Sequence, residues 1–300
     1  MIALLAPGQG SQTPGMLAEW LELTGAADRI AVWSQIGGLD LARLGTTATG
    51  EEITDTAVTQ PLVVAATLLA YGELARRGLP AGTVVAGHSV GEIAAYAIAG
   101  VISPDDAVKL AAVRGAEMAK ACAAEATGMA AVLGGDEAEV LARLEALELV
   151  PANRNAAGQI VAAGTVAALE KLAEDPPAKA RVRQLATAGA FHTHFMSSAL
   201  DGFAAAAAEV TAKEPTTTLL SNFDGRPVTS AKDAMEKLVA QLTRPVRWDL
   251  CTETMRNLNT TAIVEFPPAG TLTGIAKREL RGVATHAVKT PADLDGLTDL

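Results

Sequence analysis

The sequence predicts an α/β fold in which helices cover both faces of a parallel sheet. Short apolar runs typical of buried strands alternate along the chain with longer segments of helical periodicity. Apolar residues make up 49% of the 300 residues and charged residues only 19%, so the chain can fill a sizeable core. We therefore expect one large α/β subdomain with a smaller companion.

Three apolar runs are the strands that we expect in the main sheet. They are residues 2–6 (IALLA), 83–87 (TVVAG) and 262–266 (AIVEF). Apolar residues at helical spacing predict helices over 60–77 and 105–123. Because strands and helices alternate, the strands of this sheet should run parallel.

The segment from about 128 to 188 has a strand–helix rhythm of its own. We expect strands at 129–134 and 158–164, and helices at 136–147 and 165–175. This compact unit is interpreted as a small subdomain inserted into the larger one. The boundaries that we expect are 1–127 and 189–300 for the large subdomain and 128–188 for the small one.

Composition and charge disfavour several classes of protein. A net charge of −10 and an aromatic content of 3% argue against nucleic-acid binding. No apolar run reaches the roughly 18 residues of a membrane span. The first ten residues lack a basic segment and meet Pro7 and Gly8 early, which indicates a strand and a turn and not a signal peptide. We expect a cytoplasmic protein whose Cys122 and Cys251 are reduced core residues.

The stretch GHSVGE (87–92) places Ser89 between two glycines, after an expected strand and before a helix-forming run. A GxSxG sequence in that context is typical of a nucleophile on a sharp strand-to-helix turn, with the positive end of the helix dipole at the reaction centre. The alternative is a serine that only caps the helix. The flanking pattern favours the nucleophile.

A nucleophilic serine needs a base, and the chain has four histidines. His88 adjoins Ser89, but neighbouring side chains diverge at such a turn, so His88 is a poor base for it. His192, His194 and His286 remain. The spacing of His192 and His194 also suits a metal, but no second cluster of histidine and carboxylate ligands accompanies them. The pattern does not separate His192 from His194.

Arg114 lies on the apolar face of the helix expected over 105–123, between Leu110 and Met118. A guanidinium on a buried face is costly unless an anion meets it. One interpretation is an ion pair with Glu117 or with another acid of the chain. The other interpretation is a binding site in which the guanidinium holds a substrate carboxylate through two hydrogen bonds.

The loop APGQGSQ (6–12) resembles a phosphate-binding loop only in part. Residue 13 is threonine, so GxGxxG fails, and no GK[ST] follows. Backbone N–H groups of such a loop can instead supply half of an oxyanion hole.

Several motifs occur in one order along the chain. They are GQGSQ (8–12), TQP (59–61), GHSVGE (87–92), VRGAEM (113–118), NAAGQIVAAG (155–164), AFH (190–192) and LVAQLTRPVRW (238–248). In this combination the chain resembles the malonyl-CoA:acyl carrier protein transacylases, the free-standing bacterial acyltransferases of dissociated fatty acid synthesis, from residue 1 to about 281. The resemblance implies a hydrolase-like large subdomain and an inserted ferredoxin-like small one.

Carried over position by position, the resemblance implies a catalytic set. Ser89 is the nucleophile and His192 its base, with a carbonyl of Gln241 in place of a triad acid to orient the ring. The backbone N–H groups of Gln9 and Val90 hold the oxyanion.

The resemblance also implies the substrate contacts. Arg114 binds the free malonyl carboxylate, and Met118 lines the same site. Phe191 matches a form that related domains associate with malonyl over methylmalonyl, because its ring crowds an α-methyl group. Malonyl-CoA is then a substrate and acyl carrier protein the partner. We expect a monomer that uses no metal, nucleotide or redox cofactor.

Two stretches depart from the family pattern. Ala157 stands where proline is usual, and EFPPAGTLTG (265–274) replaces the more usual EVGPG form. Nearby, Lys277, Arg278 and Arg281 form a basic cluster, interpreted either as a solvated helix face or as a contact for phosphates or an acidic carrier.

Two rival functions are weighed against the transacylase. A serine hydrolase such as a thioesterase shares Ser89 and the oxyanion hole but has no reason to keep a charged anchor at Arg114. A non-catalytic carrier-docking module has no need of the serine, histidine and arginine together.

Overall fold

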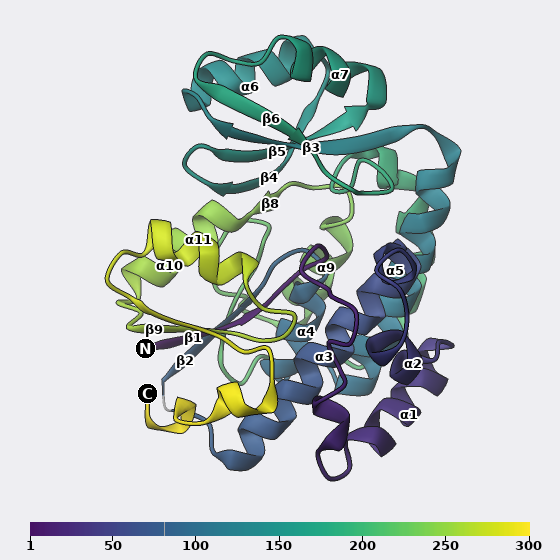
Figure 1. The fold of residues 1–300 in the computed structure, drawn as a ribbon, viewed down its shortest axis with the longest axis vertical. Helices are drawn as coiled ribbons and strands as arrows, with labels where there is room; N and C mark the ends of the chain where they lie inside the picture. Colours follow the sequence, from purple (N-terminus) through teal and green to yellow (C-terminus); the bar gives the residue numbers. More distant parts are fainter. Residues whose placement is uncertain (81) are drawn as a thin grey trace.

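The computed structural model describes residues 1–80 and 82–300, which form two lobes, each built on one sheet (Figure 1). The strands of the larger lobe are all parallel where they pair. In spatial order they are β10 (Ala284–Ala287), β9 (Ala262–Glu265), β1 (Ile2–Ala6), β2 (Thr83–Gly87) and β7 (Thr218–Leu220). This arrangement confirms the predicted α/β class and parallel sheet.

Both faces of this sheet are buried, which explains why its central strands are continuous apolar runs. Along β1, Ile2, Leu4 and Ala6 pack into one apolar cluster, whereas Ala3 and Leu5 pack into another. The first cluster includes α1 (Ala26–Gly37), α3 (Thr56–Arg77), α4 (Gly91–Ile98), α5 (Pro104–Ala124), α8 (Leu200–Ala208) and α9 (Ala231–Ala240), and the second includes α10 (Trp248–Asn257) and α11 (Thr271–Glu279). The short α2 (Leu41–Thr46) and short 3₁₀ helices at 20–22, 52–54, 194–199, 291–294 and 297–299 complete this lobe.

The two long helices match the expected ones closely. Asp55 caps α3 by accepting a hydrogen bond from Ala57 N, so the helix begins before residue 60. Ser103 caps α5 in the same way, followed by a proline in the first turn. Among the described residues, α3 alone is long and apolar enough to cross a membrane, and 72% of its apolar window is buried inside the protein.

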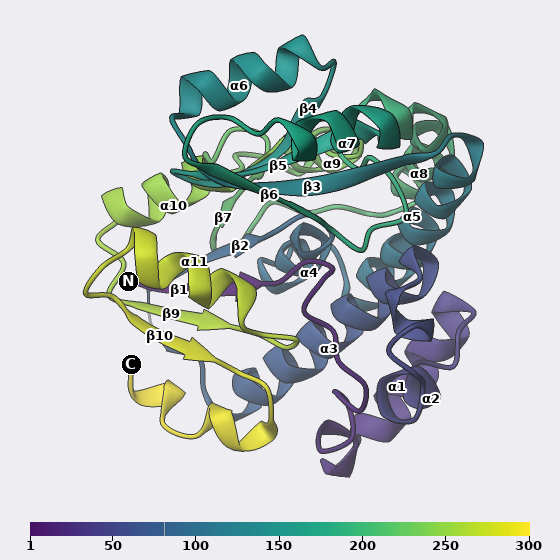
Figure 2. The ribbon, with the colours of Figure 1, turned by 45° about the horizontal axis from the view of Figure 1, so that its top comes forward.

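The smaller lobe has a mostly antiparallel sheet with two helices over its outer face, best seen in Figure 2. Its strands, in spatial order, are β6 (Ala180–Gln184), β3 (Thr127–Gly134), β5 (Gln159–Thr165), β4 (Val150–Ala156) and β8 (Val246–Arg247). The helices α6 (Glu137–Ala146) and α7 (Val166–Glu174) share an apolar core with this sheet. The order βαββαβ from β3 to β6 is the ferredoxin-like arrangement.

The structure differs from the expected strand–helix run in this lobe by two further strands. β4 (VPANRNA) carries proline and polar residues, and β6 (ARVRQ) is an edge strand that alternates arginines with smaller residues. Neither has an apolar run to reveal it. In addition, β8 joins the sheet from far along the chain by pairing in parallel with β4. The boundaries given above for the two subdomains stay a prediction.

The strand order places a topological switch point beside β1. From β1 the chain proceeds outward to β2 and β7 on one side, and later to β9 and β10 on the other. In such sheets, ligands bind at the carboxyl ends of the strands near this point. The segments that follow β1, β2 and β9 meet there and face the smaller lobe.

Close backbone contact at this edge dictates the two glycines that flank the turn after β2. A Cβ atom at Gly91 would overlap the carbonyl oxygen of Ala6 and lie 2.5 Å from that of Pro7. A Cβ atom at Gly87 would overlap the backbone of Gly91. The start of α4 can therefore pack directly on the end of β1 only when these side chains are absent.

We expect Gly91→Ala to destabilise the protein by about 1–3 kcal/mol, because the backbone must shift to admit the methyl group. Urea unfolding measures the change. Gly72→Ala in α3 is the matched control: an added Cβ there meets nothing within 4 Å. Since alanine favours a helix interior by about 1 kcal/mol over glycine, the control should stabilise. A Gly91 variant as stable as wild type would mean that the contact between α4 and β1 tolerates a methyl group.

Candidate active site

Ser89 occupies a strained turn between β2 and α4. Its φ of 54° lies in the left-handed region, which is unusual for a residue with a side chain. Asn222, two residues after the end of β7, holds the turn in place: Ser89 N donates to Asn222 Oδ1 at 2.8 Å, and Asn222 Nδ2 donates to Gly87 O at 2.6 Å. The turn thus presents the serine side chain at the carboxyl edge of the sheet.

His192 lies against this serine. Its Nε2 is 2.7 Å from Ser89 Oγ, and its Nδ1 is 2.8 Å from the main-chain oxygen of Gln241. A carbonyl oxygen only accepts, so Nδ1 carries the proton and Nε2 is free to take the serine proton. Of the other histidines, His194 is exposed, His286 lies in the edge strand β10, and His88 Nε2 is bonded to Asn155 Oδ1 at 2.8 Å. The geometry therefore brings His192, and not these three, to Ser89.

The environment of His192 keeps its imidazole neutral. The residue is 2% exposed, and burial lowers its pKa to about 3, assisted by the positive charge of Arg114 and opposed by the bond to Gln241. A neutral imidazole with a free Nε2 is the form that a general base requires.

Arg114 is buried without an anionic partner. It is 1% exposed, and its Nη1 and Nη2 donate to the side-chain oxygens of Gln60 at 2.7 Å and Gln241 at 2.9 Å. Its Nε has no hydrogen-bond partner. Within the described chain no carboxylate lies within 4.0 Å of it, and the interpretation as an ion pair with Glu117 is wrong, because Glu117 pairs with Lys120 at 2.6 Å.

Neutral partners leave the charge of Arg114 available. Burial lowers its pKa to about 10, which still leaves the group protonated at neutral pH. Three of its five N–H groups are not used by the two glutamines, since each glutamine takes one. The side chain can therefore receive a carboxylate through two parallel hydrogen bonds.

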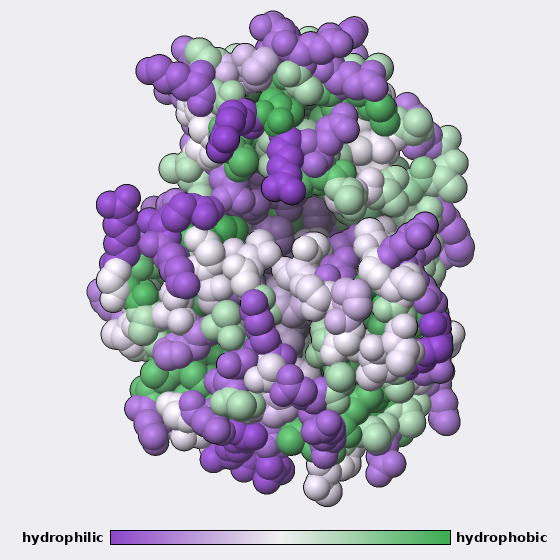
Figure 3. Space-filling model, viewed as in Figure 1, coloured by the Kyte–Doolittle hydropathy of each residue, from purple (hydrophilic) through white to green (hydrophobic). Residues whose placement is uncertain are grey.

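The predicted site residues share one cavity of about 460 Å³ between the lobes, hollowed in the face that Figure 3 shows. Its walls come from the loops after β1 and β2, from the start of α11, from α3 and α5, and from β3, β4 and β5 of the smaller lobe. All of the predicted site residues line it except Gln241, which lies behind His192 and Arg114: Gln9, Ser89, Val90, Arg114, Met118, Phe191 and His192.

Two residues that line the cavity together with Ser89 have a backbone N–H group without a partner in the described chain. Val90 precedes the first residue of α4, and Gln9 lies in the loop after β1. In residues 1–80 and 82–300, neither backbone N–H has a protein acceptor within hydrogen-bond distance. Free N–H groups beside a nucleophile are what an oxyanion hole needs.

The sequence patterns did not single out three polar residues around this cavity. Gln60 is part of the motif TQP, and Glu92 is the last residue of GHSVGE, but neither had a role of its own. Asn222 follows a strand of three residues that leaves no pattern, so its position at a strand end was not recognisable. Each is buried and bonded to Arg114, Gln241 or the turn at Ser89.

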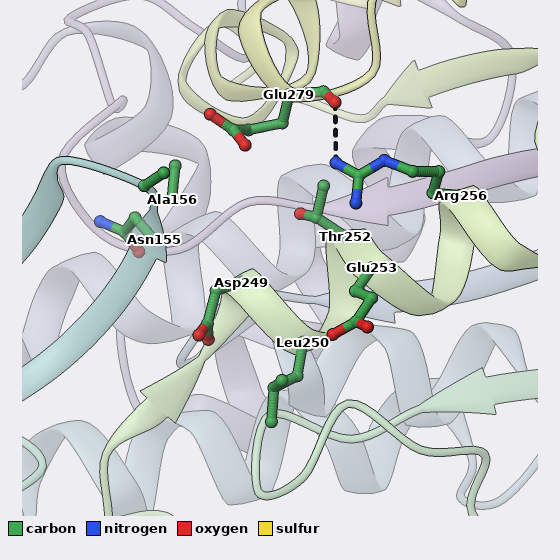
Figure 4. Close-up of a pocket in the computed structure, with 9 residues that line it drawn as sticks. Asn155, Ala156, Asp249, Leu250, Thr252, Glu253, Arg256 and Glu279 are labelled. Atoms are coloured by element: carbon green, nitrogen blue, oxygen red, sulfur yellow. Dashed lines mark hydrogen bonds between the residues drawn. The ribbon is translucent and has the colours of Figure 1, made fainter. Parts of the chain in front are cut away.

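A second depression lies behind β4 and is shown in Figure 4. It has a volume of about 150 Å³, and Arg256 Nη2 donates to the main-chain oxygen of Glu279 at 2.8 Å across it. Its acidic side chains include Asp249, which is paired with Arg247 at 2.8 Å. None of the described residues that line it is a serine, cysteine or histidine, so it offers no candidate nucleophile or base of those types.

The two-lobed α/β fold and the serine–histidine pair in its cleft define the class of serine acyltransferases and hydrolases. The model of the acyl transferase domain family matches residues 4–293. The chain belongs to this family, and it is an acyltransferase.

Individual relatives agree with the family that the motifs indicated. A malonyl CoA-acyl carrier protein transacylase of Mycolicibacterium smegmatis is 79% identical over 290 residues, which cover 95% of this chain and 100% of the relative. The crystal structure of MCAT from Mycobacterium tuberculosis superposes with a TM-score of 0.97 at 76% identity over 99% of each chain. A malonyl-transacylase solved with its type II PKS acyl-carrier protein has a TM-score of 0.94 at 30% identity, again over 99% of each chain.

The lowered pKa of His192 predicts an unusual pH profile. Acylation of the protein by a neutral ester such as p-nitrophenyl acetate should stay nearly constant from about pH 8 to about pH 5, because His192 remains unprotonated. Stopped-flow absorbance of the released nitrophenol measures it.

The same assay distinguishes the histidines. His192→Ala should lose most of the acylation rate, and His194→Ala should keep it.

In the pH profile of the wild type, an acylation rate that falls with a midpoint near pH 6.5, the ordinary pKa of a free imidazole, would refute the environment described for His192.

Proposed function

We propose that this protein transfers the malonyl group of malonyl-CoA to the phosphopantetheine thiol of acyl carrier protein through a malonyl ester on Ser89. The observation that carries the proposal is Arg114, a buried cation with neutral partners in the same cavity as Ser89 and His192. A free carboxylate at the far end of the acyl group is the ligand that such a cation selects. The relatives named as transacylases support the same reaction.

The first half-reaction acylates the serine. His192 Nε2 takes the proton of Ser89 Oγ as the oxygen attacks the thioester carbonyl. The N–H groups of Gln9 and Val90 stabilise the tetrahedral oxyanion. When the intermediate collapses, the C–S bond breaks and the protonated His192 returns its proton to the CoA sulfur.

The second half-reaction repeats these steps in the other direction. The carrier thiol gives its proton to His192 and attacks the malonyl ester, and the ester oxygen leaves as the Ser89 hydroxyl. The scheme is ping-pong. Its net result is that one malonyl group moves from CoA to the carrier and one proton from the carrier thiol to the CoA thiol, so we expect it to need no metal, nucleotide or redox cofactor.

Selectivity follows from the cavity walls. The ring of Phe191 is buried beside His192, where it would crowd an α-methyl group on the acyl chain. Met118 is buried in the same wall, with its sulfur 3.4 Å from Gln60 Nε2, and this contact turns the Gln60 oxygen toward Arg114. We propose that these residues shape the malonyl site.

The carrier would approach from the mouth of the cavity. Arg278 donates to the side chain of Gln159, which lines the cavity, and Lys277 and Arg281 are exposed nearby on and after α11. These charges are a local attraction for phosphates or an acidic carrier on a chain of net charge −10. We further propose a cytoplasmic monomer that binds neither nucleic acid nor membrane.

Intact-protein mass spectrometry after mixing with malonyl-CoA tests the function. We expect one malonyl adduct that disappears when phosphopantetheinylated carrier protein is added, and no adduct on Ser89→Ala. An adduct lost to water alone would indicate a thioesterase. A persistent adduct on Ser89→Ala would exclude Ser89 as the nucleophile.

Arg114→Ala should cost about 1.5–3 kcal/mol in malonyl transfer, the value of a hydrogen bond to a charged group. Transfer of acetyl, which lacks the carboxylate, should change little, so the preference for malonyl relaxes. Arg114→Lys should be intermediate because it keeps the charge without the fork. Unchanged kcat/KM for malonyl-CoA in Arg114→Ala would reject the carboxylate seat.

A further inference from the structure

Glu92 is a buried carboxylate that the reaction scheme does not use. It lies in the first turn of α4, is 0% exposed, and accepts a hydrogen bond from Asn222 N at 2.6 Å through Oε1. Its other oxygen accepts from Gln241 Nε2. In the part of the chain that the structure describes, no lysine, arginine or histidine forms an ion pair with it. A buried charge without a direct counter-charge is costly, so its retention requires a reason.

Its contact with Gln241 determines which way that carboxamide points. Gln241 Nε2 donates to Glu92 and, at 3.1 Å, to Ser89 O, so Oε1 is turned to Arg114 Nη2 at 2.9 Å. The reversed amide would present its NH₂ group to Arg114, which only donates, and its oxygen to a carboxylate, which only accepts. Glu92 and Arg114 therefore select the same orientation from opposite ends.

We propose that Glu92 is a positioning residue for carboxylate recognition, which fixes the Gln241 carboxamide so that it holds the Arg114 guanidinium with its free N–H groups toward the substrate. The inference rests on the proposed malonyl transfer.

The Glu92 carboxylate is separated from the Arg114 guanidinium by the Gln241 carboxamide, and this separation keeps Arg114 able to bind a substrate. A direct ion pair would neutralise the guanidinium and occupy the N–H groups that the substrate carboxylate needs. Through one neutral amide, Glu92 balances part of the buried charge and leaves these N–H groups free. Burial raises the pKa of Glu92 to about 7, although the N–H donors at its two oxygens and the charge of Arg114 act to lower it.

The arrangement also separates recognition from proton transfer. The side chain of Gln241 serves Arg114, whereas its main-chain oxygen serves His192. A change in the side-chain network should therefore affect substrates with a carboxylate more than substrates without one. Acetyl-CoA has the same thioester and lacks only that group, so it reports on Ser89 and His192 alone.

Glu92→Gln tests the proposal, because it keeps the size of the side chain and removes the group that only accepts. We expect kcat/KM for acylation by malonyl-CoA to fall about tenfold, the lower range for one charged hydrogen bond, and that for acetyl-CoA to change less than about twofold. Glu73→Gln in α3 is the matched control and should leave both values unchanged, because Glu73 is mostly buried and paired with Arg76 and Arg77 and does not line the cavity.

A double-mutant cycle shows whether Glu92 acts through Arg114. In an Arg114→Ala background, Glu92→Gln should reduce malonyl transfer by less than about twofold, because the guanidinium through which Glu92 acts is absent. If Glu92→Gln does not fold, Glu92→Asp keeps a carboxylate but withdraws it from Gln241 Nε2, and should show the same selective loss for malonyl-CoA.

If Glu92→Gln lowers kcat/KM by the same factor for malonyl-CoA and for acetyl-CoA, the inference is overturned in favour of a structural role. It is also overturned if kcat/KM changes for neither donor. A wild-type protein that takes no malonyl group would instead overturn the proposed function. The two failures are thus distinguishable in one set of measurements.

Discussion

The direct packing of the start of α4 on the end of β1 is the contact on which the site depends. It is possible only because Gly87 and Gly91 lack side chains. Within the single turn that this contact fixes lie Ser89, the free N–H of Val90 and the carboxylate of Glu92. One short stretch thus supplies the nucleophile, half of the proposed oxyanion hole and the carboxylate proposed to position Gln241.

The rest of the site is assembled around a buried positive charge. Arg114 faces two glutamine oxygens and no carboxylate, and its charge helps to keep His192 neutral. Gln241 connects these residues, because its side chain touches Arg114 and Glu92 and its main chain touches His192. In the reaction we propose, the same cation that binds the substrate carboxylate also helps to keep the base neutral.

The fold was predictable where burial is uniform. β1, β2 and β9 are apolar on both faces, so their runs are continuous and were recognised. β7 and β10 are short edge strands of the first sheet, and β6 is an edge strand of the second. β7 has only three residues, and polar or charged residues interrupt β10 and β6, so none of the three carries a recognisable apolar run. The pairing of β8 with β4 joins residues about ninety positions apart, which no local pattern records.

The sequence by itself determined the parts of the site that are local. The glycines around Ser89 require a tight strand-to-helix turn, and an arginine on an apolar helix face requires a compensating group. The local pattern left His192 and His194 undecided, and only the resemblance to the family assigned His192 to the serine. The tertiary structure brings His192 and Ser89 together across 103 positions, and it alone decided that Gln241 and not Glu117 meets Arg114, across 127. Periodicity describes which face a side chain occupies, whereas these contacts depend on how separate elements pack, and packing is a property of the whole fold.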